Sequence, residues 1–307
     1  GDRHGEHEIA DPVGEQDPAL DLAAAPDDRV GRPVGPRSRR GVGCRGIWGT
    51  RGAGHTVALM VRVERRDDVA AGLELITLDR PEVRNAVDHD TLLALIEAID
   101  RIAEPTSGAR VVVLTGSPPA FSAGADLLGV EESAFADALA RVLHGFAALG
   151  VPVMAAIDGP ALGAGAQLAA VSDLRVATAD SVVGIPAARL GLAVDHWTVD
   201  RMVHEFGASV ARNMLLGAST YRGDELHVMG AVHRLGDLDD ALGWAERLAH
   251  LAPLTLAAHK RAIEASFGRR DDDHEAEAAR ARAWASADAT EGRSAFLDKR
   301  RPIFRGE

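Results

Sequence analysis

The 307-residue chain has a single cysteine, Cys44, which excludes an intramolecular disulfide. A protein with so little cysteine is typical of a reducing compartment, so we expect it in the cytoplasm. Aromatic residues make up only 4% of the chain, so its core must consist mainly of alanine, valine, leucine and isoleucine. With 46% hydrophobic and 26% charged residues, the composition nevertheless predicts a globular protein with a sizeable core.

Positive charge is outnumbered, with 34 lysine and arginine residues against 46 aspartate and glutamate residues, and the formal net charge of -12 argues against nucleic acid as the main partner. It does not exclude a small anionic ligand, because a local basic patch can override the overall sign. Long apolar runs are missing too. The most apolar window, residues 147–171, is interrupted by Pro152, Asp158, Pro160 and Gln167. It therefore predicts a buried core segment and no integral membrane contact.

Residues 1–59 differ from the rest of the chain. They are rich in glycine, proline, aspartate and arginine and show no apolar period, so we expect a disordered extension. Two alternatives remain open: a basic docking arm at residues 37–51, or a segment outside the natural protein with Met60 close to its true start. We expect a folded core over residues 60–252 and a helical C-terminal region over residues 253–307.

From Val61 onward, strands and helices alternate. Strands are expected at residues 73–79, 110–115, 154–157 and 174–177. A first helix is expected at residues 88–102, and further helices at residues 199–206, 209–216, 222–229, 238–251, 254–267 and 275–289. Strands that alternate with helices indicate an α/β fold with a parallel sheet flanked by helices.

The segment around Gln167 is the most informative. Residues 151–168 read as a buried strand, a glycine-rich turn and the first turn of a helix. Such a turn directs free backbone N–H groups and the positive end of the helix at a ligand, which suits a developing oxyanion. A hydrolytic or hydrating enzyme would need a carboxylate beside this oxyanion hole, yet Gln167 is an amide.

Three clusters of small residues could carry chemistry, at residues 119–127, 159–167 and 184–197. Any one of them is equally explained by tight packing between a helix and a strand. Gly163 and Gly165 also lack the third glycine and the distal acid of a dinucleotide-binding fingerprint. The order and spacing of the three clusters together are much more specific.

Five motifs together give the chain a family resemblance. They are Leu78-Asp-Arg-Pro-Glu-Val-Arg-Asn85-Ala86, Phe121-Ser-Ala-Gly-Ala-Asp126, Gly159-Pro-Ala-Leu-Gly-Ala-Gly165, Asp173-Leu-Arg-Val-Ala-Thr-Ala and Ala295-Phe-Leu-Asp-Lys-Arg-Arg-Pro-Ile-Phe304. Residues 61–307 resemble the crotonase superfamily of enoyl-CoA hydratases and isomerases. The resemblance implies an α/β fold with a crotonase-type β/β/α spiral core, a helical C-terminal trimerisation region, and a homo-oligomer, either a trimer or a hexamer.

The resemblance also implies a binding site for a coenzyme A thioester, with no permanently bound cofactor and no metal. The oxyanion hole would be formed by the N–H groups of Ala125 and Ala164. The residues expected to bind coenzyme A are Arg84, Asn85, Ala86, Ala123, Asp126, Leu127 and Lys299. For Lys299, a solvated charge in a basic tail is at least as good an interpretation.

Two departures from the family pattern decide the expected function. Active hydratases of the family carry glutamates where this chain has Gln167 and Ala187. An amide takes no proton at neutral pH and a methyl group does no acid–base chemistry, whereas each such acid or base contributes roughly 10²–10⁴ in rate. Asp195 falls where some relatives place a catalytic aspartate, but its position also predicts that it caps the helix that follows, and we favour the cap.

This combination most resembles a mycobacterial branch that is thought to bind long-chain acyl-CoA without turnover, in fatty-acid and lipid metabolism. We therefore expect a cytoplasmic acyl-CoA-binding protein that lacks hydratase activity. The alternatives are an active isomerase or hydrolase that uses Asp195, and a true hydratase with an unrecognised acid.

Overall fold

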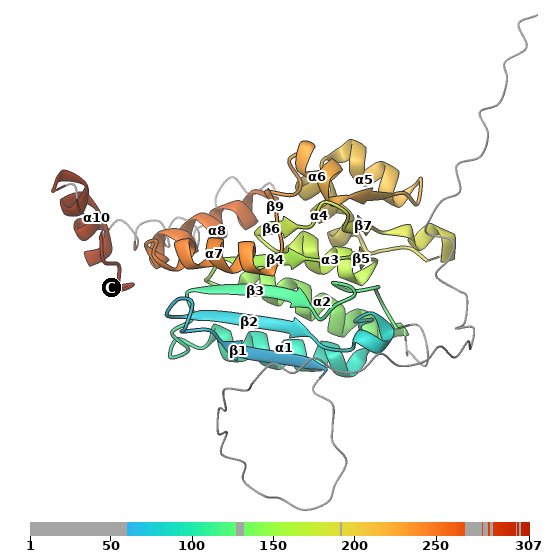
Figure 1. Ribbon diagram of the computed structural model, residues 1–307, viewed down its shortest axis with the longest axis horizontal. Coiled ribbons are helices and arrows are strands. Elements are labelled where there is room, and N and C mark those ends of the chain that lie inside the picture. Colours follow the sequence, from blue (N-terminus) through green and yellow to red (C-terminus); the bar gives the residue numbers. More distant parts are fainter. Residues whose placement is uncertain are drawn as a thin grey trace, which may run out of the picture. The chain divides into compact units, whose positions relative to one another are not determined.

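The computed structural model describes residues 60–126, 132–190, 192–267, 278, 282, 285–298, 300 and 302–307, and Figure 1 traces their helices and strands. None of the helices in these ranges is both long and apolar enough to cross a membrane.

The main sheet has six strands in the order β1-β2-β3-β4-β6-β9. Their bounds are β1 Val61–Arg65, β2 Leu73–Leu78, β3 Val111–Gly116, β4 Val153–Ile157, β6 Leu174–Ala177 and β9 Arg234–Leu235. β1 pairs with β2 in antiparallel fashion and the other neighbours are parallel. The carboxyl ends of β2, β3 and β4 therefore lie side by side at one edge, and the loops that leave them meet there.

A second, three-stranded sheet lies in the order β5-β7-β8, with β5 Pro160–Leu162, β7 Val182–Gly184 and β8 Thr220–Arg222. β5 follows β4 directly and leads into helix α3, so this sheet supports the glycine-rich turn predicted from the sequence. The sequence did not predict these short strands, because residues 159–163 read there as a turn.

The helices in the described ranges are α1 His89–Ala103, α2 Glu132–Ala148, α3 Ala164–Val171, α4 His196–Phe206, α5 Ala208–Leu215, α6 Gly223–Val228, α7 Leu238–Ala249, α8 Pro253–Phe267 and α10 Ala287–Leu297. Short 3₁₀ turns, η2 Pro81–Val83 and η3 Pro186–Leu190, follow β2 and β7. The helices predicted from residue 199 to residue 267 are confirmed within a few residues. Most of the helix predicted at residues 275–289 lies outside the described residues.

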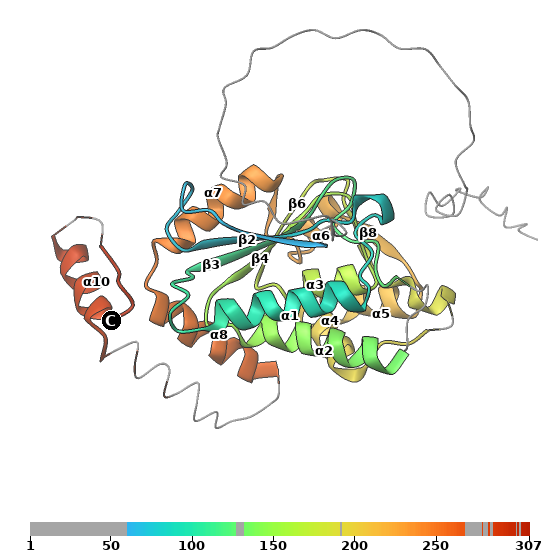
Figure 2. The ribbon, with the colours of Figure 1, turned by 90° about the horizontal axis from the view of Figure 1, so that it is seen from below.

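Helices cover both faces of the main sheet. Val111 and Val113 of β3 pack with the apolar residues of α7, whereas Val112 and Leu114 belong to the core shared with α1 and α2. Figure 2 shows α7 on one side of the sheet and the α1 and α2 layer on the other. A strand buried on both faces needs a continuous apolar run, which explains the sequence of β3.

Candidate functional site

The loops that follow β2, β3 and β4 are tied together by backbone hydrogen bonds. The N–H of Ala123 donates to the carbonyl of Arg84 (2.9 Å), joining the loops after β3 and β2. The N–H of Leu162 donates to the carbonyl of Ser122 (2.9 Å), joining β5 to the loop after β3. The structure thus brings together the first two of the three clusters singled out in the sequence.

The two N–H groups of the expected oxyanion hole, those of Ala125 and Ala164, belong to adjacent segments. Ala164 is the first residue of α3, and a Cβ atom on Gly124 would lie 3.7 Å from its backbone nitrogen. A Cβ on Gly124 would also lie only 2.9 Å from the carbonyl oxygen of Leu162, so only glycine permits this approach. Among the described residues, neither N–H donates to an acceptor. Both remain available to a ligand oxygen.

Asn85 has a structural role. Its side chain is buried, and its Nδ2 donates to the carbonyls of Ser117 (2.7 Å) and Ala120 (2.6 Å). Its Oδ1 accepts from the N–H of Arg80 (2.9 Å). These bonds satisfy the amide within the protein, so Asn85 would shape a coenzyme A site by holding two loops together, not by side-chain contact with the ligand.

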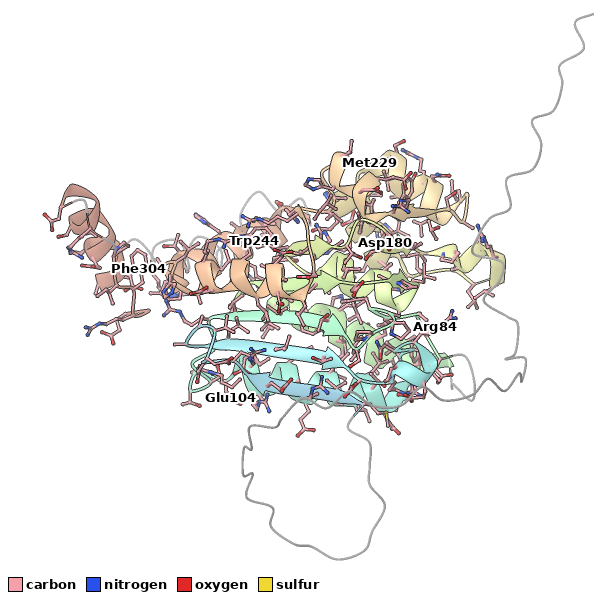
Figure 3. All side chains as sticks on the ribbon, in the orientation of Figure 1. Arg84, Glu104, Asp180, Met229, Trp244 and Phe304 are labelled. Carbon is pink, nitrogen blue, oxygen red and sulfur yellow. The ribbon has the colours of Figure 1, made fainter. Side chains whose placement is uncertain are left out.

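Arg84 and Ala86 flank Asn85 and behave differently. Arg84 is exposed and has a left-handed backbone (φ 53°), and Figure 3 shows it at the sheet edge toward which β2 and β3 point. Ala86 is partly buried, and its carbonyl accepts a hydrogen bond from Arg80 Nη1 (2.7 Å).

Arg80 was given no role by the sequence analysis, although it lies within the first family motif. Its guanidinium pairs with the carboxylates of Asp88 (2.9 Å) and Asp126 (3.2 Å), and the Arg80 side chain is largely buried. Asp88 begins helix α1, and Asp126 lies in the loop after β3. Arg80 therefore holds the loop of the expected hole against the start of α1.

Gln167 is the fourth residue of α3 and is only 8% exposed. The structure has its Oε1 3.1 Å from the hydroxyl oxygen of Thr198 in helix α4. Because Gln167 follows Ala164 by three residues, the two lie on the same face of the helix. The amide thus stands one turn from the expected hole.

Asp195 is the N-cap of helix α4. Its carboxylate accepts hydrogen bonds from the backbone N–H of Thr198 (3.0 Å) and from the Thr198 hydroxyl (2.9 Å). Partial burial raises the pKa of this carboxyl, but the hydrogen bonds from Thr198 outweigh burial and hold the pKa below its usual value. The capping interpretation is confirmed, and a carboxylate of lowered pKa is a weak base.

Ala187 lies in η3, partly buried against the main core. Its methyl group has no acid or base function. Leu127 and Lys299, also expected to bind coenzyme A, lie outside the described residues. Within the described ranges, no three His, Cys, Asp or Glu side chains are grouped so that they could hold a metal ion.

Thr198 is a second residue whose role the sequence analysis did not identify, yet the signal was present. Asp195 and Thr198 form an Asp-x-x-Thr pattern, and Asp88 and Thr91 form another at the start of α1. Thr91 donates its N–H (2.8 Å) and its hydroxyl (2.6 Å) to Asp88. Helices α1 and α4 are therefore capped in the same way.

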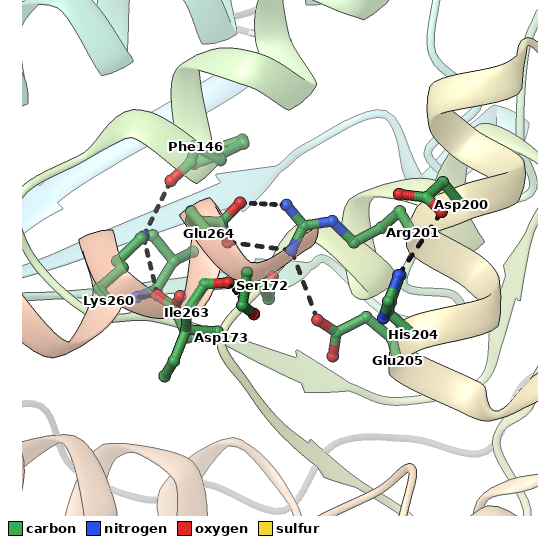
Figure 4. A network of polar contacts seen from close by, with 12 residues as sticks. Phe146, Ser172, Asp173, Asp200, Arg201, His204, Glu205, Lys260, Ile263 and Glu264 are labelled. Atoms are coloured by element: carbon green, nitrogen blue, oxygen red, sulfur yellow. Dashed lines mark hydrogen bonds and ion pairs between the residues drawn. The ribbon is translucent and has the colours of Figure 1, made fainter. Parts of the chain in front are cut away.

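Charged side chains connect helix α4 to neighbouring elements, as Figure 4 shows. Arg201 makes a double hydrogen bond to Glu264 of α8 and also pairs with Glu205 (3.4 Å). Glu205 in turn pairs with the buried Arg175 (2.5 Å). This arrangement connects α8 and β6 to the helix whose first turn carries Asp195 and Thr198.

A hollow of about 370 Å³ lies between α2, α4 and α8. Its lining includes His144 and Trp197, whose rings meet edge to face at 4.6 Å. Lys260, Arg261 and Glu264 also line it. Together with Arg282, these make four charged side chains in the lining, so this hollow is unsuitable for an acyl chain.

A mostly parallel sheet between helix layers, with two adjacent free N–H groups where its loops meet, defines a crotonase-type fold. The sequence model of the enoyl-CoA hydratase/isomerase family matches residues 68–307. The chain belongs to this family, as its motifs predicted.

The similar proteins include mycobacterial ones. The chain is 38% identical over 240 residues to a probable enoyl-CoA hydratase echA6 of Mycobacterium leprae, covering 77% of this chain and 97% of that protein. It is 33% identical over 245 residues to the 2,3-dehydroadipyl-CoA hydratase of Escherichia coli, covering 76% and 94%. The predicted similarity to a mycobacterial branch is confirmed.

Solved structures agree on the fold. A family protein of Hyphomonas neptunium, described as a putative enoyl-CoA hydratase/isomerase, superposes with a TM-score of 0.73 at 29% identity. This match covers 82% of this chain and all of the other. An enoyl-CoA hydratase/carnithine racemase of Magnetospirillum magneticum also gives 0.73, at 27% identity, covering 81% and 96%.

Proposed function

We propose that the protein binds fatty acyl-CoA thioesters and does not add water to them. The thioester carbonyl would be held by the N–H groups of Ala125 and Ala164. Two free N–H groups, one of them at the start of helix α3, favour an oxygen that carries partial negative charge. Arg84, exposed at the same sheet edge, supplies a positive charge for the coenzyme A phosphates.

The observation that carries the second half of the proposal is the hydrogen bonding around Gln167. Its amide is engaged with Thr198, and an amide cannot exchange a proton with water at neutral pH. The neighbouring carboxylate, Asp195, accepts two hydrogen bonds as a helix cap and has a lowered pKa. With a methyl group at Ala187, the site has a means of binding and polarising a thioester but lacks a group that activates water.

Activity is the alternative, and two observations favour it. Similar proteins are named hydratases, among them one for 2,3-dehydroadipyl-CoA. Asp195 is exposed and is connected to Gln167 through the Thr198 hydroxyl, so a substrate could reach its carboxylate. An isomerase or hydratase that uses Asp195 is therefore the rival to be tested.

Self-association, as a trimer or a hexamer in the cytoplasm, is part of the proposal. Leu216 after α5 and Val228 of α6 expose 82% and 88% of their surfaces. An assembly would cover such residues. Light scattering of the purified protein measures the assembly mass, and a monomer at micromolar concentration would contradict this part.

Binding is tested by calorimetric titration of palmitoyl-CoA and of free coenzyme A. We expect palmitoyl-CoA to bind more tightly, and Ala164→Pro to weaken its binding by about tenfold or more, since one oxyanion donor is lost. Proline is tolerated at the first helical position, so the helix should survive. Gly243→Ala, on the surface of α7, is the matched control. If Ala164→Pro binds palmitoyl-CoA with unchanged affinity, the N–H of Ala164 does not hold the thioester carbonyl.

A further inference from the structure

The hydroxyl of Thr198 lies between two acceptors. Its oxygen is 2.9 Å from Asp195 Oδ2 and 3.1 Å from Gln167 Oε1. A threonine hydroxyl carries one proton, so it donates to only one of them. If it donated to Gln167, two oxygens without a proton between them would face each other at 2.9 Å, one of them on a carboxylate.

Charge decides which acceptor receives the proton. A hydrogen bond to an ionised carboxylate is roughly twice as strong as one to a neutral amide. The lowered pKa of Asp195 keeps it ionised at neutral pH. The Thr198 hydroxyl therefore donates to Asp195, and its lone pairs are left to accept from Gln167.

The carboxamide of Gln167 can meet this requirement without repacking. Its two ends have nearly the same shape, so a half-turn about the last side-chain bond exchanges Oε1 and Nε2. Nε2 of Gln167 then donates to the Thr198 hydroxyl, which donates to Asp195. Each of these two hydrogen bonds then has one donor and one acceptor. The backbone N–H of Thr198 already donates to Asp195 (3.0 Å), which holds the cap in place.

We propose that Thr198 is a positioning residue that turns the carbonyl oxygen of Gln167 toward the ligand, so that the site prefers an acyl thioester with a hydrogen-bond donor at that place. The preference for a ligand rests on the proposed function. The orientation of the amide does not.

The helix sets where the donor must lie. Gln167 follows Ala164 by three residues, which is a rise of about 4.5 Å, and helical side chains lean toward the N-terminus. The Gln167 oxygen thus lies a few ångströms from an oxygen bound at the Ala164 N–H. In an acyl thioester, that span reaches the third carbon. A 3-hydroxyl group donates to Gln167, whereas a 3-oxo group presents a second acceptor.

The test compares three ligands of one chain length by calorimetry: saturated, 3-hydroxyacyl- and 3-oxoacyl-CoA. Each affinity is divided by that of the saturated ligand, so that a general loss of binding cancels. We expect the 3-hydroxy ligand to bind roughly three- to tenfold more tightly than the 3-oxo ligand. Thr198→Val should bring the ratio of the 3-hydroxy to the 3-oxo affinity to about one, because the amide can then turn freely. Thr198→Ser should retain the ratio.

Thr91→Val is the matched control, since it removes the equivalent hydroxyl of the α1 cap, away from Gln167. It should leave the ratio as in the unaltered protein. A 3-oxo ligand that binds as tightly as the 3-hydroxy ligand overturns the preference while leaving acyl-CoA binding intact.

A measurement without ligand tests the orientation itself. Neutron diffraction from crystals of the deuterated protein locates the deuterons on Thr198 and Gln167. We expect one deuteron between Thr198 Oγ1 and Asp195, and one between Gln167 Nε2 and Thr198 Oγ1. A deuteron on Thr198 that points to Gln167 overturns the proposal. If no acyl-CoA binds, the proposed function fails and this measurement still decides the orientation.

Discussion

The carboxylate of Asp195 and the residue Thr198 form a closed cap, in which Thr198 donates both its N–H (3.0 Å) and its hydroxyl (2.9 Å) to the same side chain. This cap fixes the first turn of α4 beside Gln167. It also gives Asp195 a structural role that requires no part in catalysis. Asp195 can be retained for the helix alone.

Asp195→Ala should lower the free energy of unfolding by about 1 kcal/mol, the usual cost of losing an N-cap. Asp195→Asn should lose much less, because asparagine caps nearly as well. Chemical denaturation measures both. Equal losses for the two variants would show that the charge, and not the cap, is the stabilising feature.

The charge of Asp195 should make the stability of the protein depend on pH. Its folded pKa lies below the unfolded value of about 3.9, so its stabilisation is fully present above that pH. It is lost as the pH falls through the lower folded pKa. The stability difference between the unaltered protein and Asp195→Asn should therefore shrink on acidification below about pH 4. A difference that grows there would contradict the assigned direction.

Gly165→Ala should destabilise the protein and the loops around the hole. A Cβ on Gly165 would lie 2.5 Å from the carbonyl oxygen of Ser122, and backbone cannot easily yield. Such overpacking costs typically about 1–3 kcal/mol. Gly243→Ala is the matched control, because it meets open space within helix α7 and should stabilise by about 0.5–1 kcal/mol. Thermal melting compares the two, and a stable Gly165→Ala would refute the close approach.

The ion pair between Arg201 and Glu264 should contribute far more to the free energy of unfolding than an ion pair on the surface. Their side chains are 6% and 18% exposed, and Glu264→Gln removes the carboxylate charge that makes the double hydrogen bond to the buried Arg201. Breaking a buried pair costs about 3–5 kcal/mol, and we expect the lower end here. The pair of Arg141 and Asp100, with 63% and 62% exposed side chains, is the control, and Asp100→Asn should cost less than about 1 kcal/mol. Similar losses at both pairs would contradict this account.

Arg80→Met should affect both stability and binding. It removes the cation that now pairs with the carboxylates of both Asp88 and Asp126. We expect a loss of about 2–3 kcal/mol, less than for a fully buried pair, and weaker palmitoyl-CoA binding because the loop that carries Ala125 is released. Arg80→Lys should recover part of both, since lysine keeps the charge but lacks the fork of donors. If Arg80→Met unfolds at the same denaturant concentration as the unaltered protein, Arg80 does not hold the loop after β3 against α1.

Much of the fold could be predicted from the sequence because its signals are local. The apolar run of β3 indicates a strand covered on both faces, and the helical periodicity from residue 199 to residue 267 predicts the helices there. The strands β5, β7 and β8 could not be predicted. Each has three residues, and each exists only because a partner elsewhere in the chain supplies its hydrogen bonds.

The site was only partly predictable for a related reason. Small residues around Ala125 and Ala164 indicate that two backbones approach a ligand, and the structure brings these segments together. The same acidic residue before a helix serves a cap or a catalyst, so the sequence alone left Asp195 open. Arg80 and Asn85 act through contacts between loops, which no local pattern reveals.

The most direct test of the central claim is the rate of crotonyl-CoA hydration, followed as the loss of the conjugated thioester absorbance, on a preparation that calorimetry has shown to bind palmitoyl-CoA. The account predicts binding together with a rate no greater than that without protein. Hydration above that background, abolished by Asp195→Asn, would contradict the claim and identify Asp195 as the acid or base of an active hydratase.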